Sequence, residues 1–284
     1  MSLHPVLGRA DPGGCRAGTI DGRRCAARGI RSSASVAVTR MEVMWIPTEP
    51  VDVPDVVLSL AGEAALEPVW VNELGGITFR TDDGRFIKHG PRNAETTFAG
   101  EAERLAWAAR FAAVPRVLTH GADASQEWLV SAAIPGESAV VPRWVAQPAT
   151  AVRAIGEGLR ALHDALPVDE CPFEWSVPSR RANAERRGIR VPDDLREPPP
   201  VDRLVVCHGD ACSPNTLISD DGTWSGHVDF GALGTGDRWA DIAVAAMSTE
   251  WNYGPGWDEA LIHAYGVEPD HLRLAYYRDL WNAT

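Results

Sequence analysis

The chain has 284 residues, 45% of them apolar and 23% charged, which is ordinary for a globular protein of one large domain or two lobes. No run approaches the roughly 18 apolar residues of a membrane span. The formal net charge is −12, although the first forty residues are Arg-rich, so the remainder is strongly acidic and nucleic-acid binding is not expected.

Residues 1–40 are rich in Gly, Ala, Arg and Ser and lack both periodic apolar positions and the apolar segment of a secretory signal. We predict that they form a disordered N-terminal extension. Their Arg-rich, acid-poor composition is also compatible with an organellar transit peptide. Because Met41 and Met44 offer alternative starts of translation, we favour the extension.

Residues 69–79 predict two strands joined by a tight turn at Gly75-Gly76. The alternating segment 84–88 follows and ends at Lys88, the single lysine of a chain with 26 arginines. A compact ammonium group on a flexible stem suits a site between phosphate oxygens better than the planar guanidinium does. This favours a phosphate-binding role for Lys88 over the survival of one surface lysine by chance.

A helix is predicted next, from about Glu95 or Thr96 to Phe111. In kinases a glutamate of the following helix holds the strand-borne lysine, so the partner of Lys88 is sought here. The acidic candidates are Glu95, Glu101 and Glu103.

Residues 127–133 form a short apolar strand, and Pro135-Gly136 then bends the chain. Apolar residues spaced by three and four predict a one-faced helix from Thr150 to Ala165. His163 within this helix is interpreted as a packed structural histidine rather than a general base.

The segment 167–200 is rich in Arg and Pro and predicts an irregular excursion with a short helix over 179–187. The last helices are expected within 239–248 and 257–281.

The most informative stretch is 204–241. The apolar run Leu204–Cys207 is followed by His-Gly-Asp210 and Asn215, and Asp229-Phe-Gly follows after a predicted hairpin. Phosphoryl transfer needs a group that orients the attacking hydroxyl and oxygen ligands for Mg²⁺, and the hairpin would bring these side chains together. Asp210 suits the first role, and Asn215 and Asp229 the second. Taken singly, each is also a common turn or cap residue.

The chain has five cysteines without paired metal-ligand spacing, so zinc and a disulfide framework are not expected and a reducing cytoplasm is. Cys212 in the loop after Asp210 is either a reactive thiol or, as we favour, a small loop filler.

The stretch 204–241 resembles the aminoglycoside phosphotransferases, and within them the 3′-phosphotransferase branch with its protein-kinase-like fold. The resemblance extends from about residue 69 to 278 and is carried by His208-Gly209-Asp210, Asn215, residues 228–231 and residues 237–243. It implies Asp210 as catalytic base, Asn215 and Asp229 as Mg²⁺ ligands, and Asp241 as a buried support of the catalytic loop.

For the nucleotide, the resemblance implies that Lys88 contacts phosphates and pairs with Glu101, while Glu95 and Glu103 are solvated helix residues. It implies that Gly75 and Gly76 form the flap over the phosphates. It places Phe86 where some members stack an aromatic ring on adenine, although a plain core residue is an equal reading. The backbone groups of Ser131 and Ala133 would bind adenine at the hinge.

For the acceptor, the resemblance implies acidic groups on the 167–200 excursion and the C-terminal helix. The excursion carries both signs of charge, and Asn282 takes the place of a carboxylate of the family. The predicted acceptor contacts are Arg238, Asp258, Glu259, Asp279 and the terminal carboxylate of Thr284.

We therefore expect an α+β, two-lobed protein-kinase-like fold, with a small antiparallel-sheet, nucleotide-binding N-lobe over 41–134 and a larger, mostly helical C-lobe over 135–284 with the catalytic and acceptor sites. The expected reaction is Mg²⁺-assisted transfer of the γ-phosphoryl group of ATP or GTP to a hydroxyl of a small molecule. The acceptor that we favour is the 3′-hydroxyl of an aminoglycoside, whose phosphorylation confers antibiotic resistance. A kinase of choline, homoserine or a sugar, and a non-catalytic nucleotide-binding module, are the alternatives. No nucleic-acid, membrane or obligate protein partner is expected.

Overall fold

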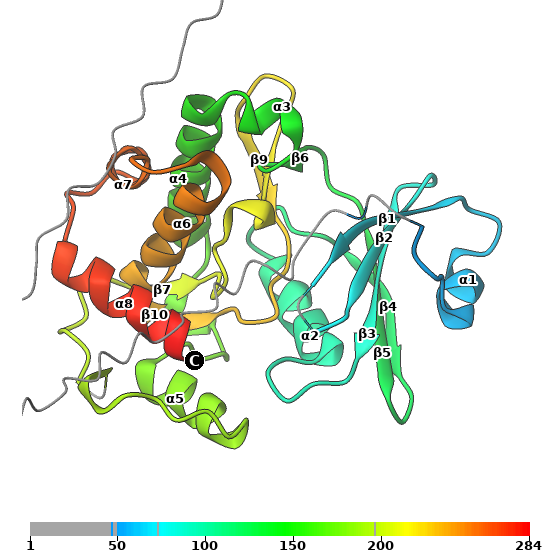
Figure 1. Cartoon of the computed structure of the whole chain (residues 1–284), viewed down its shortest axis with the longest axis horizontal. Coiled ribbons are helices and arrows are strands. Elements are labelled where there is room, and N and C mark those ends of the chain that lie inside the picture. Colours follow the sequence, from blue (N-terminus) through cyan, green and yellow to red (C-terminus); the bar gives the residue numbers. More distant parts are fainter. Residues whose placement is uncertain (1–46, 48–49, 73, 196) are drawn as a thin grey trace, which may run out of the picture. The chain divides into compact units, whose positions relative to one another are not determined.

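The structure, a computed structural model, describes residues 47, 50–72, 74–195 and 197–284. The predicted extension over residues 1–40 lies outside the described residues. In the described part, no helix has the length and apolar character needed to cross a membrane. The architecture is the expected α+β fold of two lobes, a small one built on an antiparallel sheet and a larger, mostly helical one (Figure 1).

The N-lobe is built on a five-stranded antiparallel sheet in the order β1-β2-β3-β5-β4. Its strands are β1 Leu66–Val71, β2 Ile77–Thr81, β3 Arg85–Pro91, β4 Val117–Ala122 and β5 Gln126–Ala132. Helix α1 (Asp55–Ala61) covers one face, where Val57 packs with Phe79 and Ile87. Because side chains alternate along a strand, Lys88 lies on the opposite face of β3 from Ile87.

Helix α2 spans Phe98–Ala108 and is shorter than predicted at both ends. It begins after Thr97, whose hydroxyl accepts a hydrogen bond from Gly100 N at 3.0 Å and so caps the first turn. The residues before it form a loop instead, because Asn93 Oδ1 accepts from the backbone N–H groups of Glu95 and Thr96. The expectation that Glu95 belongs to the helix was therefore wrong.

The C-lobe contains the remaining elements. Its helices are α3 Pro142–Val145, α4 Pro148–Ala165, α5 Val177–Arg186, α6 Arg238–Tyr253, α7 Asp258–Tyr265 and α8 His271–Ala283, with 3₁₀ turns η2 Val168–Glu170, η3 Asp193–Leu195 and η4 Ser213–Asn215. The predicted short helix over 179–187 corresponds to α5. It begins two residues earlier because Ser176 caps it, accepting from Ser179 N.

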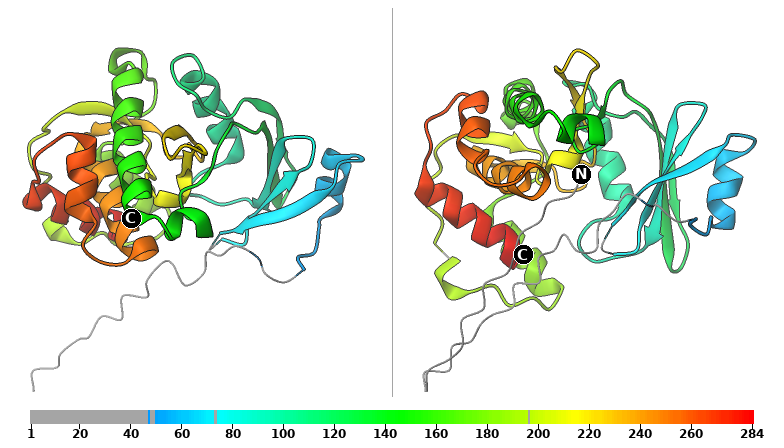
Figure 2. Two further views of the ribbon diagram at one scale, coloured as in Figure 1. Left: turned by 90° about the horizontal axis from the view of Figure 1, so that it is seen from above. Right: turned by 45° about the horizontal axis from the view of Figure 1, so that its top comes forward.

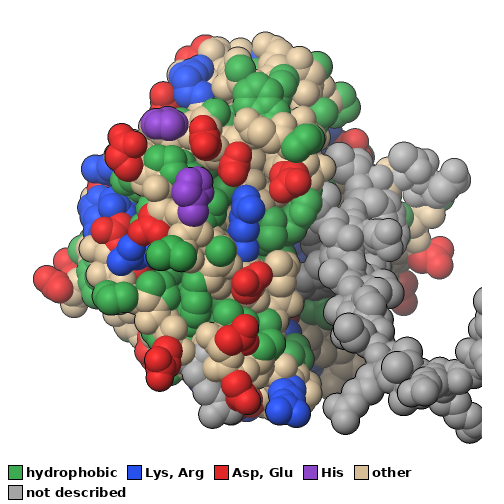
Figure 3. Space-filling view, turned by 60° about the vertical axis from the view of Figure 1, so that its left-hand side comes forward, with side chains coloured by type: hydrophobic (Ala, Val, Ile, Leu, Met, Phe, Trp, Pro, Cys, Tyr) green, Lys and Arg blue, Asp and Glu red, His purple; other side chains and the backbone are tan. Residues whose placement is uncertain are grey.

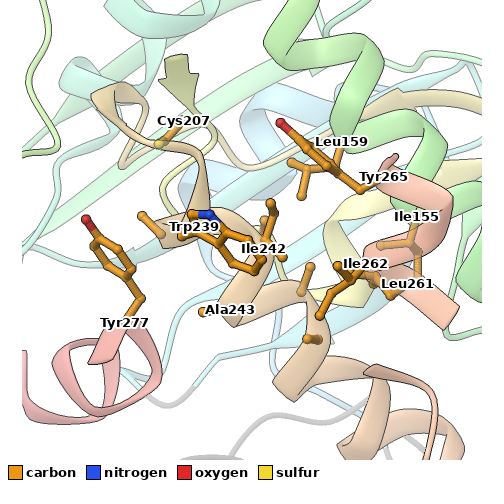
Figure 4. Close-up of a cluster of buried hydrophobic side chains, with 14 of the residues drawn as sticks. Ile155, Leu159, Cys207, Trp239, Ile242, Ala243, Leu261, Ile262, Tyr265 and Tyr277 are labelled. Carbon is orange, nitrogen blue, oxygen red and sulfur yellow. The ribbon is translucent and has the colours of Figure 1, made fainter. Parts of the chain in front are cut away.

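The core of the C-lobe lies between α4, α6, α7 and α8. Figure 4 shows Trp239 and Ile242 of α6 among side chains of α4 and α7, and both views of Figure 2 show α4 running beside α6 and α7. On the face drawn in Figure 3, acidic, basic and apolar side chains of the described residues are interspersed. The core of the C-lobe is thus mainly helical, and the loops of its two small sheets lie outside that helical packing.

Two small sheets carry those loops. Strands β7 Leu204–Cys207 and β10 Gly234–Asp237 pair antiparallel, and β6 Glu137–Ser138, β8 Thr216–Ile218 and β9 Trp224–His227 form a three-stranded sheet. The β8–β9 hairpin was expected, whereas β10 was not predicted. Its Gly-Thr-Gly-Asp sequence lacks the β-branched and aromatic residues that mark strands.

Candidate active site

The catalytic loop leaves β7 at His208 and turns sharply at Gly209. Gly209 has φ +86°, and a Cβ there would lie 2.1 Å from the carbonyl oxygen of Ala232. Only glycine fits this backbone conformation and this close approach. Gly209 thus fixes the direction in which Asp210 leaves the strand.

Asp241, in the first turn of α6, holds this turn in place. Its Oδ2 accepts from His208 N at 2.6 Å and its Oδ1 from Gly209 N at 2.9 Å, with the side chain 1% exposed. His163 Nε2 lies 2.9 Å from the same carboxylate, and His163 Nδ1 lies 2.8 Å from the Tyr265 hydroxyl. The prediction of Asp241 as a buried support is confirmed, and so is that of His163 as a packed histidine.

Ser248 continues the same support two helical turns further along α6. Its hydroxyl accepts from Ser213 N at 2.8 Å, and Asn252 Nδ2 donates to Ser248 O at 2.8 Å. Residues seven apart share a helix face, so Asp241 and Ser248 both point toward the catalytic loop. Their side chains accept hydrogen bonds from its backbone N–H groups.

The loop ends at Asn215, which joins Asp210 to the hairpin. Asn215 Nδ2 donates to Asp210 O at 2.9 Å and to Asp210 Oδ2 at 3.3 Å, and Val228 N donates to Asn215 O at 3.0 Å. With its amide nitrogen directed at Asp210, Asn215 can offer its side-chain oxygen, Oδ1, to a ligand. Cys212 is buried beside them, and its thiol donates to Asp210 Oδ1 at 2.9 Å.

Lys88 of the N-lobe contacts Asp229 of the C-lobe, and both residues line the cavity. Lys88 Nζ lies 2.7 Å from Glu101 Oε1 and 3.0 Å from Asp229 Oδ1. Burial opposes the charge of Lys88, but the two carboxylates raise its pKa above the ordinary value. Burial would raise the pKa of Asp229, yet the Lys88 ammonium holds it below its usual range, whereas burial keeps the pKa of Glu101 raised. At neutral pH the cluster thus presents an ammonium and the Asp229 carboxylate to the cavity.

The cavity has a volume of about 410 Å³ and lies between the two lobes. Six predicted site residues line it: Gly76, Lys88, Glu101, Asp210, Asn215 and Asp229. A volume of this size with a few convergent polar groups is typical of a small-molecule site. The structure therefore brings together, in one cavity, residues as far apart in the sequence as Gly76 and Asp229.

The predicted flap is organised by Asn72, a residue that the sequence reading did not use. Its Oδ1 accepts from Leu74 N and Gly76 N, at 3.0 and 2.7 Å, and Gly75 at the tip has φ +80°. Gly75 itself is exposed and lies outside the cavity wall, while Asn72, Leu74 and Gly76 line it.

The three predicted adenine contacts lie outside the cavity wall. Phe86 and Ser131 face each other in the register of β3 and β5, and Ala133 N donates to Gly84 O at 2.9 Å. The backbone donor predicted at Ala133 is therefore already engaged within the sheet. Phe86 shares the Lys88 face of β3, so its stacking role stays a prediction.

The model of the phosphotransferase enzyme family matches residues 77–277, which is most of the chain. The chain belongs to this phosphotransferase family.

Individual members of known function are similar over most of their length. An aminoglycoside 3′-phosphotransferase of Streptomyces fradiae is 38% identical over 223 residues, covering 68% of this chain and 82% of the relative. A streptomycin 3″-kinase of Streptomyces griseus is 31% identical, covering 75% of this chain and 89% of the relative.

Solved structures agree with this assignment. An aminoglycoside 3′-phosphotransferase of type VIII superposes with a TM-score of 0.66 at 28% identity, over 81% of this chain and 98% of that one. An aminoglycoside phosphotransferase from Streptomyces rimosus in complex with ADP and streptomycin has a TM-score of 0.62 at 26% identity, over 80% and 95% of the two chains.

The acceptor contacts predicted for this phosphotransferase are not where they were expected. Arg238 pairs with Asp202, and Arg238, Asp258, Glu259 and Asp279 do not line the cavity. These four side chains were predicted as acceptor contacts from the resemblance, and that role stays a prediction. Thr284 is buried, and its hydroxyl accepts from Arg180 Nη2 at 2.9 Å, at a neighbouring cavity.

Other residues of this phosphotransferase line the cavity without having been predicted. They were missed by sequence reasoning and line the cavity: Glu95, Arg180, Ser248, Trp251, Asn252 and Trp281. Glu95 is not a solvated helix residue, since it lies 3.0 Å from Arg187 and is half-buried. The spacing of Asp241, Ser248 and Asn252 along one helix face was the signal that could have identified the last two.

Proposed function

We propose that this phosphotransferase moves the γ-phosphoryl group of ATP or GTP to a hydroxyl of a small molecule. The acceptor that we favour is the 3′-hydroxyl of an aminoglycoside. The observation that carries the proposal is the position of Lys88. It lies between Glu101 and Asp229 and lines the same cavity as Asp210 and Asn215.

Asp210 is the residue that we assign to the acceptor hydroxyl. Hydrogen bonds from Asn215 Nδ2 and Cys212 Sγ reach its two carboxylate oxygens, so the carboxylate has a fixed orientation. A fixed carboxylate can accept the hydroxyl hydrogen and aim the oxygen at phosphorus without reorganising during the reaction.

Lys88 is assigned to the phosphates of the nucleotide. Glu101 holds the ammonium at the point where it also meets Asp229, and the positive charge stabilises the negative charge that phosphate oxygens carry during transfer. Glu101 thus positions the lysine, and the glycine-containing turn after Asn72 closes the cavity above it.

Magnesium is assigned to Asn215 and Asp229. Both line the cavity with side-chain oxygens, and Asp229 is kept ionised by Lys88. Two oxygen donors of the protein, completed by phosphate oxygens and water, suit the octahedral all-oxygen preference of Mg²⁺. When bound, the ion would neutralise phosphate charge.

The aminoglycoside acceptor rests on the relatives, several of which are named for this activity at up to 38% identity. We also propose that the lobes divide between residues 134 and 135, that the protein works in the cytoplasm, and that it confers resistance on a host exposed to its acceptor.

The direct test is a coupled assay of ADP release with kanamycin A, combined with location of the phosphate on the product by phosphorus NMR. We expect Asp210→Asn to lower kcat by about a thousandfold, because the orienting carboxylate is lost, with unchanged nucleotide affinity by calorimetry. Asp220→Asn, on an exposed turn of the same hairpin, is the matched control and should keep full activity. Near-full turnover of Asp210→Asn would refute the assigned role.

A further inference from the structure

The cavity has a second half that the phosphoryl-transfer residues do not use. On the C-lobe side of Asp210 its wall is made by α5, α6, α8 and the residues after β6. The side chains that line this part of the cavity include Arg180, Cys212, Ser248, Trp251, Asn252 and Trp281. Since Asp210 is assigned to the acceptor hydroxyl, the acceptor ring has to lie against this wall.

Two tryptophans dominate the wall. Trp251 comes from the last turn of α6 and Trp281 from the last turn of α8, and their ring centroids are 5.7 Å apart at an angle of 44°. Both pack in one cluster with Cys212, two residues after Asp210, and Trp281 is 9% exposed. The aromatic surface therefore begins next to the reacting position.

Charge is scarce on the same wall. Of the described charged residues that line the cavity, Lys88, Glu101 and Asp229 belong to the phosphate cluster, and Glu95 lies 3.0 Å from Arg187. Beside the tryptophans are Asp210, which the reaction uses, and Arg180, whose Cζ lies 5.4 Å from the Trp175 ring. No carboxylate of the described α8 residues lines this cavity.

An amine-rich ring is poorly served by this arrangement. Each ammonium group that leaves water needs a carboxylate or another acceptor, and without one its desolvation is a net cost. A tryptophan face can hold one cation, but a second ammonium group needs a carboxylate partner of its own. Aromatic side chains instead match the apolar face of a ring whose polar groups lie at its edge.

We infer that Trp251 and Trp281 are the specificity-determining wall of the acceptor site, and that the ring bearing the reacting hydroxyl carries at most one ammonium group. The inference rests on the proposed function and sharpens it. Within the amino sugars, the structure selects acceptors whose reacting ring is hydroxyl-rich and amine-poor.

Kanamycin A and kanamycin B provide a matched pair of probes, because the ring with the 3′-hydroxyl carries one amine in the first and two in the second. We expect kcat/KM to be about tenfold higher for kanamycin A, since the additional ammonium group lacks a partner. Dissociation constants are measured in parallel by calorimetry with a non-hydrolysable ATP analogue and Mg²⁺. Equal or better values for kanamycin B would overturn the inference.

Variants test the wall itself. Trp251→Leu and Trp281→Leu keep an apolar side chain, and each should raise the KM for kanamycin A about tenfold while the KM for ATP stays unchanged. Trp251 is half-buried, so it serves if Trp281→Leu fails to fold. Trp257→Leu replaces a half-buried tryptophan that does not line the cavity and is the control. An unchanged acceptor KM in both wall variants would refute the inference.

Failure of the inference and failure of the proposed function are distinguishable. Transfer to both kanamycins with the opposite preference contradicts only the amine-poor wall. Absence of both transfer to and binding of either compound contradicts the aminoglycoside acceptor and, with it, the wall.

Discussion

The two halves of the cavity differ in how their side chains are held. In the nucleotide half, Lys88 lies within 3.0 Å of both its carboxylate partners, and the loop bearing Asp210 is hydrogen-bonded to buried groups of α6. In the acceptor half, the wall is the packed surface of helix ends, chiefly Trp251 and Trp281. The first half is fixed by specific polar contacts and the second by packing.

This difference explains how one scaffold can keep its chemistry while its acceptor changes. Helix α6 serves both halves, since its first turns hold the catalytic loop through Asp241 and its last turn supplies Trp251. A substitution near Trp251 alters the wall some ten residues away from Asp241. We therefore expect variants of the two halves to separate cleanly in their kinetic effects.

After Asp210→Asn, the largest effect is expected at Lys88. Lys88→Arg keeps the charge but replaces a compact ammonium with a planar fork that cannot occupy the point between Glu101 and Asp229. We expect kcat/KM for ATP to fall about a hundredfold, with the acceptor dissociation constant unchanged. Steady-state kinetics and calorimetry measure the two quantities.

Arg80→Lys is the control for that exchange, because Arg80 forms an exposed ion pair with Glu67 on the neighbouring strand and should tolerate it. If Lys88→Arg weakened acceptor binding as much as it weakens catalysis, the division of the cavity into two halves would not hold.

The next effect is expected at the buried support. Asp241→Asn places an amide nitrogen opposite a backbone N–H that now donates to a carboxylate oxygen, leaving that donor unsatisfied. The free energy of unfolding should fall by about 2–3 kcal/mol. Chemical denaturation followed by circular dichroism measures the change.

Asp164→Asn removes a half-exposed carboxylate that pairs with Arg160 and Arg203, and we expect it to cost below about 1 kcal/mol. Equal losses in the two variants would mean that the catalytic loop does not depend on the α6 support.

The smallest effect concerns His227, on the hairpin strand that leads to Asp229. Burial, followed by the nearby His208 and His163, lowers the pKa of His227 well below its ordinary value. Below about pH 6.5 the unfolded chain takes up a proton at this residue that the folded chain does not. The contribution of His227 to the free energy of unfolding is therefore fully present above that pH and is lost as the pH falls. The loss should approach about 1.4 kcal/mol per pH unit.

His227→Asn keeps an acceptor for Trp224 Nε1 and should flatten the decline in unfolding free energy between pH 7.5 and 5.5. His263→Asn changes an exposed histidine and should leave the slope intact. A slope that is the same in wild type and His227→Asn would show that this histidine is not held neutral.

The nucleotide half was predictable from the sequence because its information is local or chemically distinctive. A single lysine among 26 arginines identified Lys88, and the spacing of Asp210, Asn215 and Asp229 around one hairpin indicated their convergence. The α+β two-lobed fold was predicted correctly from the resemblance to the aminoglycoside phosphotransferases.

The acceptor half was not predictable, since it depends on how α5, α6 and α8 rotate against one another. Nothing local shows that Trp281 lines the cavity while Asp279, two residues earlier on the same helix, faces solvent. For a similar reason Glu95 was misjudged, because its loop is set by Asn93 and by Arg187 far along the chain.

Among the described residues, Asp229 is the non-glycine residue with a positive φ, +68°, a left-handed conformation that costs most residues about 1 kcal/mol and that Asp and Asn tolerate better. Backbone conformation alone favours glycine at this position, whereas the ion pair with Lys88 and the proposed Mg²⁺ ligand need the carboxylate. A substitution that relaxes this backbone would remove the carboxylate as well, so a search for thermostable variants of this enzyme needs an activity screen in every round.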